Sequence, residues 1–342
     1  MDEFSKIEAL KAIVCGPQRK MVIVTHTNPD GDAIGSTLAW TEVLEHLGHT
    51  VTCLVPNRYP SFLDWMDGIE RMVIAKDEPE RATAAIAEAE TVFVMDLNNI
   101  DRLDAMSEAL EANTSAERIL IDHHLSPPDQ FFLQFSYPDL CSTSFITLRL
   151  IIEVLGENFI TKPIAENLYA GIMTDTGNFA FSFLTPDLMR SVAVLLEHGL
   201  DIPKVNTSVY CSYSESRVRL LGYSLCNKMT ILEKGKAAYI SLSESEMRRF
   251  NFKLGDSEGF VNYPLTIVGV KISALFIETR KFIRVSLRSR GDEVDVNLFA
   301  RRYFGGGGHK NAAGGKSFVS LKETANNFRK AVAEYFAEHP EL

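Results

Sequence analysis

The chain has 342 residues, of which 46% are hydrophobic and 23% are charged, and this length suits two domains that each bury a core. No apolar stretch reaches the roughly 20 residues of a membrane span, and the N-terminus lacks the basic segment of a signal peptide, so we expect a soluble, cytoplasmic protein. The formal net charge of −10 argues against a protein that binds long nucleic acid, which would normally carry a basic surface, but it is compatible with a short phosphorylated substrate.

Short apolar runs alternate with helix-compatible stretches over the first 200 residues. Such alternation is typical of βαβ units, in which helices connect parallel strands. We therefore expect residues 1–199 to form an α/β domain with a mostly parallel, five-stranded sheet flanked by helices. The predicted strands are residues 21–25, 50–55, 71–75, 91–95 and 118–121.

Beyond Asp122 the pattern becomes helical. Three helices are predicted over residues 144–155, 163–174 and 186–198, and glycines follow the first and the third. The polar stretch 200–215 carries no strand pattern, so we expect a linker there that is helical in part.

The remaining residues, 216–342, have the character of a smaller α+β domain. Strands are expected over 237–240, 266–276 and 282–287, and a helix over 296–303. A run of four glycines and a histidine, Gly305 to His309, follows that helix.

Polar residues follow three of the predicted strands at the point where each strand ends. The segment His26-Thr27-Asn28-Pro29-Asp30-Gly31-Asp32 follows the first, Asp96 follows the fourth, and Asp122-His123-His124 follows the fifth. Ligands of α/β sheets bind beyond the carboxyl ends of the strands. An ordinary turn built on Asn28 and Gly31 would also explain the first segment, but the recurrence of acids and histidines favours a binding site.

The residue types at these strand ends are those of a site for two divalent cations. Two such ions clamp the attacking and leaving oxygens of a phosphoryl displacement, and they need several carboxylates because they repel each other. A mixed carboxylate and imidazole set suits Mn²⁺, with Mg²⁺ or Co²⁺ as alternatives, and the absence of cysteine ligands argues against structural zinc. The candidate metal ligands are His26, Asp30, Asp32, Asp96, His123 and Asp175.

These motifs, in this order and over nearly the whole chain, resemble those of the DHH/DHHA1 phosphoesterases. The motifs are His26-x-x-x-Asp30-x-Asp32, Asp96, Asp122-His123-His124, Asp175-Thr176-Gly177 and Gly305-Gly306-Gly307-Gly308-His309. The resemblance implies an N-terminal DHH domain that binds the metals and a C-terminal DHHA1 domain that binds the substrate.

The resemblance also implies how the ligands divide between the two ions. His26, Asp30 and Asp96 would hold one ion, whereas Asp32, Asp96, His123 and Asp175 would hold the other, so that Asp96 bridges them. A hydroxide shared by the ions would be the nucleophile. For Asp175 the alternative is a capping or turn aspartate.

Two further residues of the second histidine motif are candidate catalytic residues. Asp122 either orients a ligand histidine or binds a metal directly. His124 faces the substrate phosphate or stabilises the leaving group, and the alternative is a hydrogen-bonded structural histidine.

The glycine run in the second domain is a candidate phosphate-binding segment. Consecutive glycines bring backbone N–H groups close to an anion, especially if a short helix starts there, although a flexible linker would have the same composition. In the resembled family an arginine and a serine at the end of a strand act together with this segment. The substrate-binding residues implied are Arg288, Ser289, Gly307, Gly308 and His309.

The compact size is similar to that of family members that act as oligoribonucleases and as phosphatases of 3′-phosphoadenosine-5′-phosphate. We therefore expect hydrolysis of short oligonucleotides or dinucleotides to mononucleotides, together with conversion of 3′-phosphoadenosine-5′-phosphate to AMP. Alternative substrates are the linear products of cyclic dinucleotides and polyphosphate. An alternative of another class is a non-catalytic nucleotide-binding regulator, which should have lost metal ligands. The resemblance also favours a homodimer.

Overall fold

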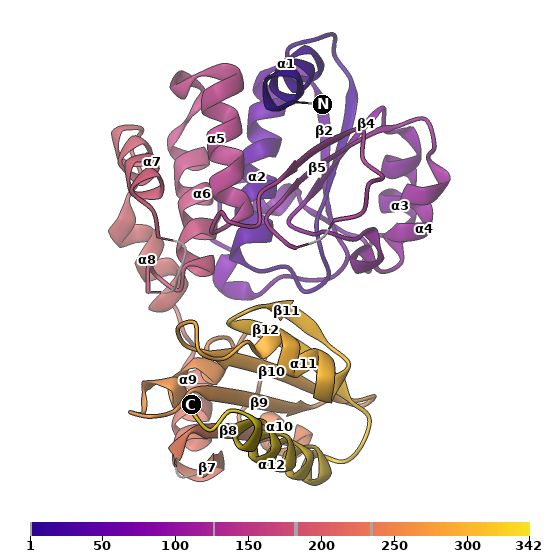
Figure 1. The fold of residues 1–342 in the computed structure, drawn as a ribbon. Coiled ribbons are helices and arrows are strands. Elements are labelled where there is room, and N and C mark those ends of the chain that lie inside the picture. Colours follow the sequence, from indigo (N-terminus) through magenta and orange to yellow (C-terminus); the bar gives the residue numbers. More distant parts are fainter. Residues whose placement is uncertain (1, 126, 181–183, 233–234) are drawn as a thin grey trace. The chain divides into compact units, whose positions relative to one another are not determined.

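The computed structural model describes residues 2–125, 127–180, 184–232 and 235–342. The chain forms two compact units, Met1–Ser212 and Tyr213–Leu342. Both are built from a sheet and helices, which confirms the expected α/β domain followed by a second domain with its own sheet (Figure 1). The range expected to be a linker, 200–215, contains helix α8 (Ile202–Tyr210), and the two units divide after this helix.

The sheet of the first unit has six strands, all parallel, in the order β3-β2-β1-β4-β5-β6. The chain therefore adds β2 and β3 on one side of β1, and it then returns to add β4, β5 and β6 on the other side. In α/β sheets, ligands bind beyond the carboxyl ends of the strands at such a reversal, which here lies between β1 and β4. The strands are β1 (Lys20–Val24), β2 (Thr50–Val55), β3 (Val73–Ile74), β4 (Thr91–Met95), β5 (Glu117–Asp122) and β6 (Leu133–Ser136).

The sixth strand, β6, was not among the predicted strands. It has four residues, lies at the edge of the sheet, and alternates between buried and half-buried positions where it pairs with β5. Two prolines, Pro127 and Pro128, precede it. So short an alternating segment after prolines carries little strand signal, although pairing with β5 satisfies its backbone groups.

Both faces of this sheet are buried, as parallel sheets require. Alternate strand residues point to opposite faces: Ile23 and Phe93 belong to one core, and Val22 and Val92 to another. Helices α1 (Glu3–Val14), α2 (Gly31–His46), α5 (Thr143–Leu155) and α6 (Lys162–Asp175) cover the first face, and α3 (Pro79–Glu88) and α4 (Met106–Ala112) the second (Figure 1). Helix α7 (Pro186–Glu197) packs against α6.

Helices α2 and α6 approach each other closely because glycines line their contact. A Cβ atom on Gly35 would lie 2.4 Å from the Asn167 carbonyl oxygen of α6, and one on Gly31 would lie 2.5 Å from Thr174 Oγ1. A Cβ on Gly171 would meet Ser144 and Asp32. These glycines hold the start of α2 and the end of α6, which carry candidate metal ligands, at short range.

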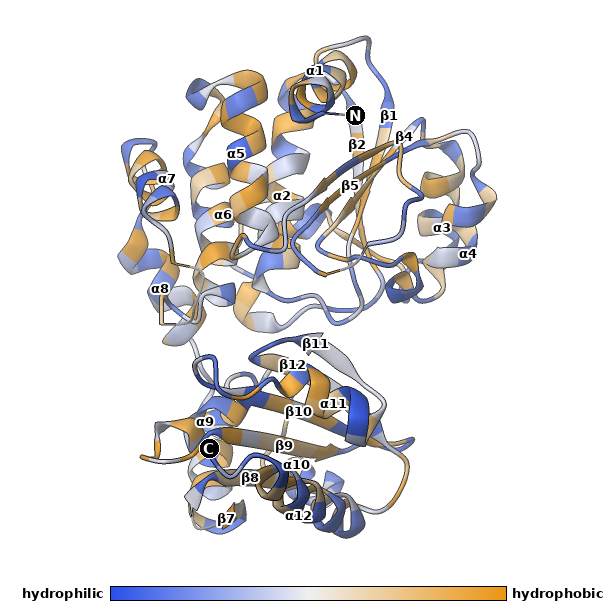
Figure 2. Cartoon of the chain, viewed as in Figure 1, coloured by the Kyte–Doolittle hydropathy of each residue, from blue (hydrophilic) through white to orange (hydrophobic). Residues whose placement is uncertain are grey.

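The second unit has a six-stranded mixed sheet in the order β11-β12-β10-β9-β8-β7, in which only β8 and β9 pair in parallel among the described strands. Figure 2 shows that its central strand β9 is predominantly apolar, as is β4 of the first unit. Its strands are β7 (Met229–Leu232), β8 (Ala237–Leu242), β9 (Ile272–Glu278), β10 (Ile283–Ser289), β11 (Gly307–His309) and β12 (Ala312–Ser317); its α-helices are α9 (Glu215–Tyr223), α10 (Glu244–Arg249), α11 (Val296–Phe304) and α12 (Leu321–Glu338).

One predicted strand of the second unit has different bounds in the structure. The expected strand over 266–276 starts only at Ile272, because a 3-10 helix, Phe260–Thr266, and a turn at Gly269 with φ of 92° occupy the preceding residues. The glycine run does not start a helix: Gly307–His309 is strand β11, which pairs with β12 as a hairpin. Among the described residues, no helix combines the length and the hydropathy needed to cross a membrane.

The close contact of α2 with α6 predicts the effect of a small substitution. We expect Gly35→Ala to lower the free energy of unfolding by about 1–3 kcal/mol, because the added methyl group would overlap the Asn167 carbonyl and force the helices apart. Calorimetric unfolding of the wild type and the variant measures this loss.

Gly222→Ala is the matched control, since Gly222 is helical and an added Cβ would meet nothing within 4 Å. Here the better helix propensity of alanine should raise stability by about 0.5–1 kcal/mol. Stabilisation by Gly35→Ala as large as that by Gly222→Ala would contradict the close packing of α2 on α6.

Candidate metal centre

The three polar strand ends identified in the sequence lie side by side in the first unit. Strands β1, β4 and β5 are consecutive in the sheet, and His26, Asp96 and Asp122 stand at or just beyond their carboxyl ends. All six candidate metal ligands belong to this unit. The site therefore lies at the reversal of strand order between β1 and β4.

The turn after β1 places its two aspartates at the start of α2. Asp30 is the N-cap of that helix, and its Oδ1 accepts hydrogen bonds from the backbone N–H groups of Asp32 and Ala33, both at 3.1 Å. Asp30 thus has the capping role of an ordinary turn, yet its carboxylate also lies within reach of His26 and Asp96 in a group that could hold a cation. Capping and ligand roles are compatible, because a carboxylate has two oxygens.

Asp96 occupies the middle of the site. Its backbone has a φ of 59°, in the left-handed region that aspartate tolerates better than most residues, and this conformation turns the chain sharply at the end of β4. Asp96 Oδ2 lies 3.3 Å from His26 Nε2, and Asp96 Oδ1 lies 3.5 Å from His123 Nε2. One carboxylate therefore presents a different oxygen to each of two imidazoles.

His123 lies among three carboxylates. Its Nε2 is 3.2 Å from Asp175 Oδ2 and 4.0 Å from Asp32 Oδ2, in addition to its contact with Asp96. Asp175 is the last residue of α6, where the negative end of the helix dipole disfavours a carboxylate. A bound cation would compensate this unfavourable charge, and this would explain why an aspartate occupies the position.

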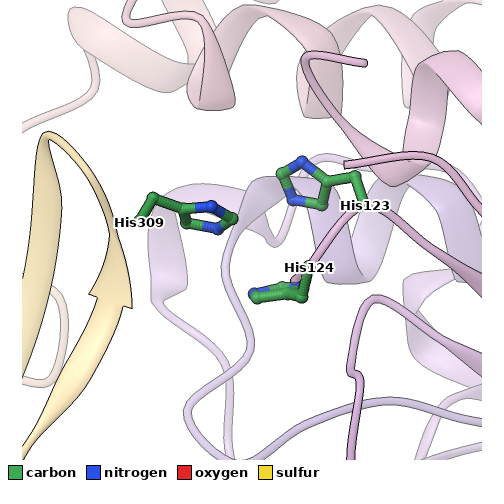
Figure 3. A group of neighbouring side chains, drawn as sticks. All are labelled: His123, His124 and His309. Carbon is green, nitrogen blue, oxygen red and sulfur yellow. The ribbon is translucent and has the colours of Figure 1, made fainter. Parts of the chain in front are cut away.

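Hydrogen bonds orient His26 and His124. His26 Nδ1 lies 2.8 Å from its partner, the Thr27 carbonyl oxygen, so that nitrogen carries the proton and Nε2 is left with a lone pair toward Asp96. His124 Nδ1 lies 2.7 Å from Asp122 Oδ1, a contact that fixes the ring of His124. Figure 3 shows the rings of His123 and His124, whose centroids are 4.9 Å apart at an interplanar angle of 70°.

Two residues at the start of α5, Thr143 and Ser144, contact the candidate ligands and were not among the residues predicted from the sequence. Their backbone N–H groups donate to the two oxygens of Asp32 at 2.7 and 2.8 Å, and the Thr143 hydroxyl donates to Asp96 Oδ1 at 3.0 Å. The run Ser142-Thr143-Ser144 before an apolar stretch is a helix-start signal, but that signal does not reveal which carboxylates the helix start contacts.

Burial and mutual repulsion change the acidity of the central carboxylates. Burial raises the pKa of Asp32 to about 7, although the N–H groups of α5 oppose the rise. Burial and the neighbouring Asp32 hold the pKa of Asp96 well above its usual range. Burial lowers the pKa of His26, so its imidazole is neutral and can bind a metal.

The carboxylate and imidazole ligand atoms of the site suit divalent cations. Among the described residues of the first unit, three groups of side chains have ligand atoms within 4.8 Å of one another: His26 with Asp30 and Asp96, Asp32 with Asp96 and His123, and Asp96 with Asp122 and His124. Buried carboxylates at such short range must retain protons or gain cations, because their charges repel in a site screened from water. Aspartates with neutral imidazoles, without thiols, are ligands of Mn²⁺ and of related divalent ions.

The candidate substrate-binding residues lie together in the second unit. Arg288 on β10 pairs with Ala312 of β12, and Ala312 pairs with His309 of β11, the third histidine drawn in Figure 3. Ser289 is buried, and its hydroxyl donates to the Val294 carbonyl oxygen at 2.8 Å. The Ser289 oxygen also accepts a hydrogen bond from Asn311 Nδ2 at 3.3 Å, so the Ser289 side chain is held in place by the fold.

The glycines of the hairpin allow close approach within the protein itself. A Cβ on Gly308 would lie 2.4 Å from the Ala312 carbonyl oxygen, and the Gly308 φ is 152°. The Gly308 N–H donates to Asn297 Oδ1 at 3.0 Å, so this N–H is already used by a buried asparagine of α11. Asn297 was missed in the sequence, where it is one polar residue within a predicted helix.

Two models of known families match this chain, one in each of its two units. Residues 20–172 match the model of the DHH family, N-terminal domain, and residues 234–338 match the model of the DHHA1 domain. Together the two matched segments include every candidate site residue except Asp175.

Individual relatives cover nearly the whole chain. A bifunctional oligoribonuclease and PAP phosphatase, NrnA, from Thermus thermophilus is 30% identical over 90% of this chain and 86% of its own length. The protein of the same name from Bacillus subtilis is 26% identical over 86% of this chain and 88% of its own length. The crystal structure of an exopolyphosphatase-related protein from Bacteroides fragilis, 37% identical, superimposes with a TM-score of 0.92 over 98% of both chains. With its buried histidine and aspartate groups, the chain belongs to the DHH/DHHA1 family of metal-dependent phosphoesterases.

Proposed function

We propose that this phosphoesterase hydrolyses short oligonucleotides and dinucleotides to mononucleotides, and that it also converts 3′-phosphoadenosine-5′-phosphate to AMP. The observation that carries the proposal is the Asp96 carboxylate, whose two oxygens face His26 and His123 at 3.3 and 3.5 Å. A carboxylate shared in this way is the ligand that a pair of cations needs for phosphoryl transfer.

His26, Asp30 and Asp96 would hold one divalent cation, and Asp32, Asp96, His123 and Asp175 the other, with Mn²⁺ as the preferred ion. When bound, the cations would supply positive charge for the phosphoryl oxygens and would activate a water molecule. Asp122 accepts a hydrogen bond from His124 Nδ1, and this contact fixes the ring of His124, which is proposed to assist the departure of the leaving oxygen.

Arg288, Ser289, Gly307, Gly308 and His309 are proposed to bind the substrate. A guanidinium such as that of Arg288 binds a phosphate through two parallel hydrogen bonds. The net charge of −10 supports a substrate with few phosphates, because a long nucleic acid would be repelled. The names of the Thermus thermophilus and Bacillus subtilis relatives support the same substrate class.

Polyphosphate is a second candidate substrate. The observation that favours it is the name of the Bacteroides fragilis relative, described as exopolyphosphatase-related, which is 37% identical over nearly the whole chain. A polyphosphate has no bases to recognise, so only phosphate contacts such as those of Arg288 would hold it.

A substrate panel tests the proposal. Di- to decanucleotides, 3′-phosphoadenosine-5′-phosphate and polyphosphate are assayed with Mn²⁺, and products are resolved by chromatography. We expect the highest kcat/KM for the shortest oligonucleotides, turnover of the bisphosphate, and no activity in the Asp96→Asn variant, which keeps the shape of the side chain but loses the shared charge. Turnover of polyphosphate alone would overturn the nucleotide assignment, and full activity of Asp96→Asn would overturn the role of Asp96.

The raised pKa of Asp32 predicts a pH dependence of metal binding. Because Asp32 keeps its proton up to about pH 7, a cation that uses this carboxylate must displace the proton at lower pH. The affinity for Mn²⁺ should therefore fall by about tenfold for each pH unit below 7 for each proton displaced, and it should recover above pH 7.

Isothermal titration calorimetry in two buffers of different ionisation enthalpy measures both the affinity and the protons released. Release of at least one proton per chain near pH 6 is the expected result. The same affinity at pH 6 and pH 8 with no proton release would contradict the assignment of Asp32 as a ligand.

A further inference from the structure

Thr143 contacts two different candidate metal ligands. Its backbone N–H donates to Asp32 Oδ2 at 2.7 Å, and its hydroxyl donates to Asp96 Oδ1 at 3.0 Å. All three residues are buried, with exposed fractions of 0%, 0% and 2% for Thr143, Asp32 and Asp96. A single residue thus connects the aspartate at the start of α2 with the aspartate at the end of β4.

The hydroxyl contact bears on the orientation of the Asp96 carboxylate. The terminal torsion of an aspartate is broad, so the carboxylate can rotate unless something holds it. Thr143 holds Oδ1, the oxygen that lies 3.5 Å from His123 Nε2, and Oδ2 is then directed toward His26 at 3.3 Å. His124 Nδ1 lies farther from Asp96 Oδ1, at 3.7 Å. The hydrogen bond from Thr143 therefore favours the orientation in which Oδ1 faces His123 and His124 while Oδ2 faces His26.

Thr143 is itself well fixed. It is the first residue of α5, its carbonyl oxygen accepts a hydrogen bond from the Thr147 hydroxyl at 2.8 Å, and Ser142 caps the helix. The branched side chain of threonine has few rotamers, so a fixed backbone leaves the hydroxyl few positions, and its hydrogen bond to Asp96 selects one of them. Asp32 is held in turn, because the N–H groups of Thr143 and Ser144 occupy one position on each of its oxygens.

We propose that Thr143 is a positioning residue for the metal pair: its hydroxyl sets the Asp96 carboxylate in the orientation that lets one oxygen serve each cation. This inference rests on the proposed function, since it concerns the same two cations. The start of α5 fixes the distance between Asp32 and Asp96, and the Thr143 hydroxyl fixes the rotation of the Asp96 carboxylate. Loss of the hydroxyl alone should therefore weaken the binding of two ions together while leaving binding of one ion possible.

Three variants separate the hydroxyl from the rest of the residue. Thr143→Val removes the hydroxyl and keeps the branched shape and the N–H contact to Asp32, whereas Thr143→Ser keeps the hydroxyl. Thr41→Val is the matched control: Thr41 is a buried threonine of helix α2, and its hydroxyl donates to the backbone carbonyl of Thr37 rather than to a carboxylate or to Thr143. Circular dichroism and thermal unfolding establish that each variant is folded.

Mn²⁺ binding to the full-length protein is the main readout, measured by calorimetry and by the electron paramagnetic resonance signal of a coupled Mn²⁺ pair. We expect Thr143→Val to weaken binding of the second ion by about 10- to 100-fold and to lose the coupled signal, as is typical when a hydrogen-bonding partner of a metal ligand is removed. Thr143→Ser should restore both, and Thr41→Val should leave both unchanged. With Mn²⁺ at a fixed concentration that saturates the wild type, kcat should fall in Thr143→Val with little change in KM.

The results distinguish the inference from the function on which it rests. If the wild type binds no coupled pair of ions, the proposed function fails. If the wild type binds the pair and folded Thr143→Val binds it equally well, or if Thr41→Val has the same effect as Thr143→Val, the positioning role of Thr143 is overturned while the proposed function stands.

Discussion

Repulsion between buried carboxylates is the constraint on which the site depends. Asp32 and Asp96 are almost completely shielded from water, Asp30 and Asp175 lie close by, and burial raises the pKa of both shielded aspartates. Charges so arranged are costly unless protons or cations compensate them. A family whose chemistry needs divalent cations gains from this cost, because binding the cations relieves it. We interpret the acidic cluster as a site that lowers the stability of the metal-free protein and, for the same reason, raises its affinity for cations.

The fold brings the cluster together by simple topological means. The reversal of strand order places the ends of β1 and β4 next to each other, and β5 adds its histidines from the adjacent position. Glycines at the contact of α2 with α6 let Asp32 and Asp175, carried by two different helices, approach the same imidazole of His123. The start of α5 then supplies donors to Asp32 and Asp96. Residues separated by more than 140 positions in the chain therefore meet through a parallel sheet and three helix ends.

Much of this arrangement was predictable, because strand ends and motif spacing are local signals. Asp30, Asp96 and His123 each follow a run of apolar residues that had to be a buried strand. What could not be predicted depends on contacts between distant segments. The link from Thr143 to Asp96 spans 47 positions and has no local signature. The edge strand β6 is too short to show a pattern, and the glycine run forms a hairpin because β12 is there to pair with it, which composition alone does not indicate.

Anomalous diffraction from crystals grown with Mn²⁺ tests the central claim most directly, namely that Asp96 is shared by two cations. We expect two anomalous peaks, one beside His26 and Asp30 and the other beside Asp32, His123 and Asp175, with one Asp96 oxygen at bonding distance from each. A single peak, or two peaks of which only one is bonded to Asp96, would contradict the account.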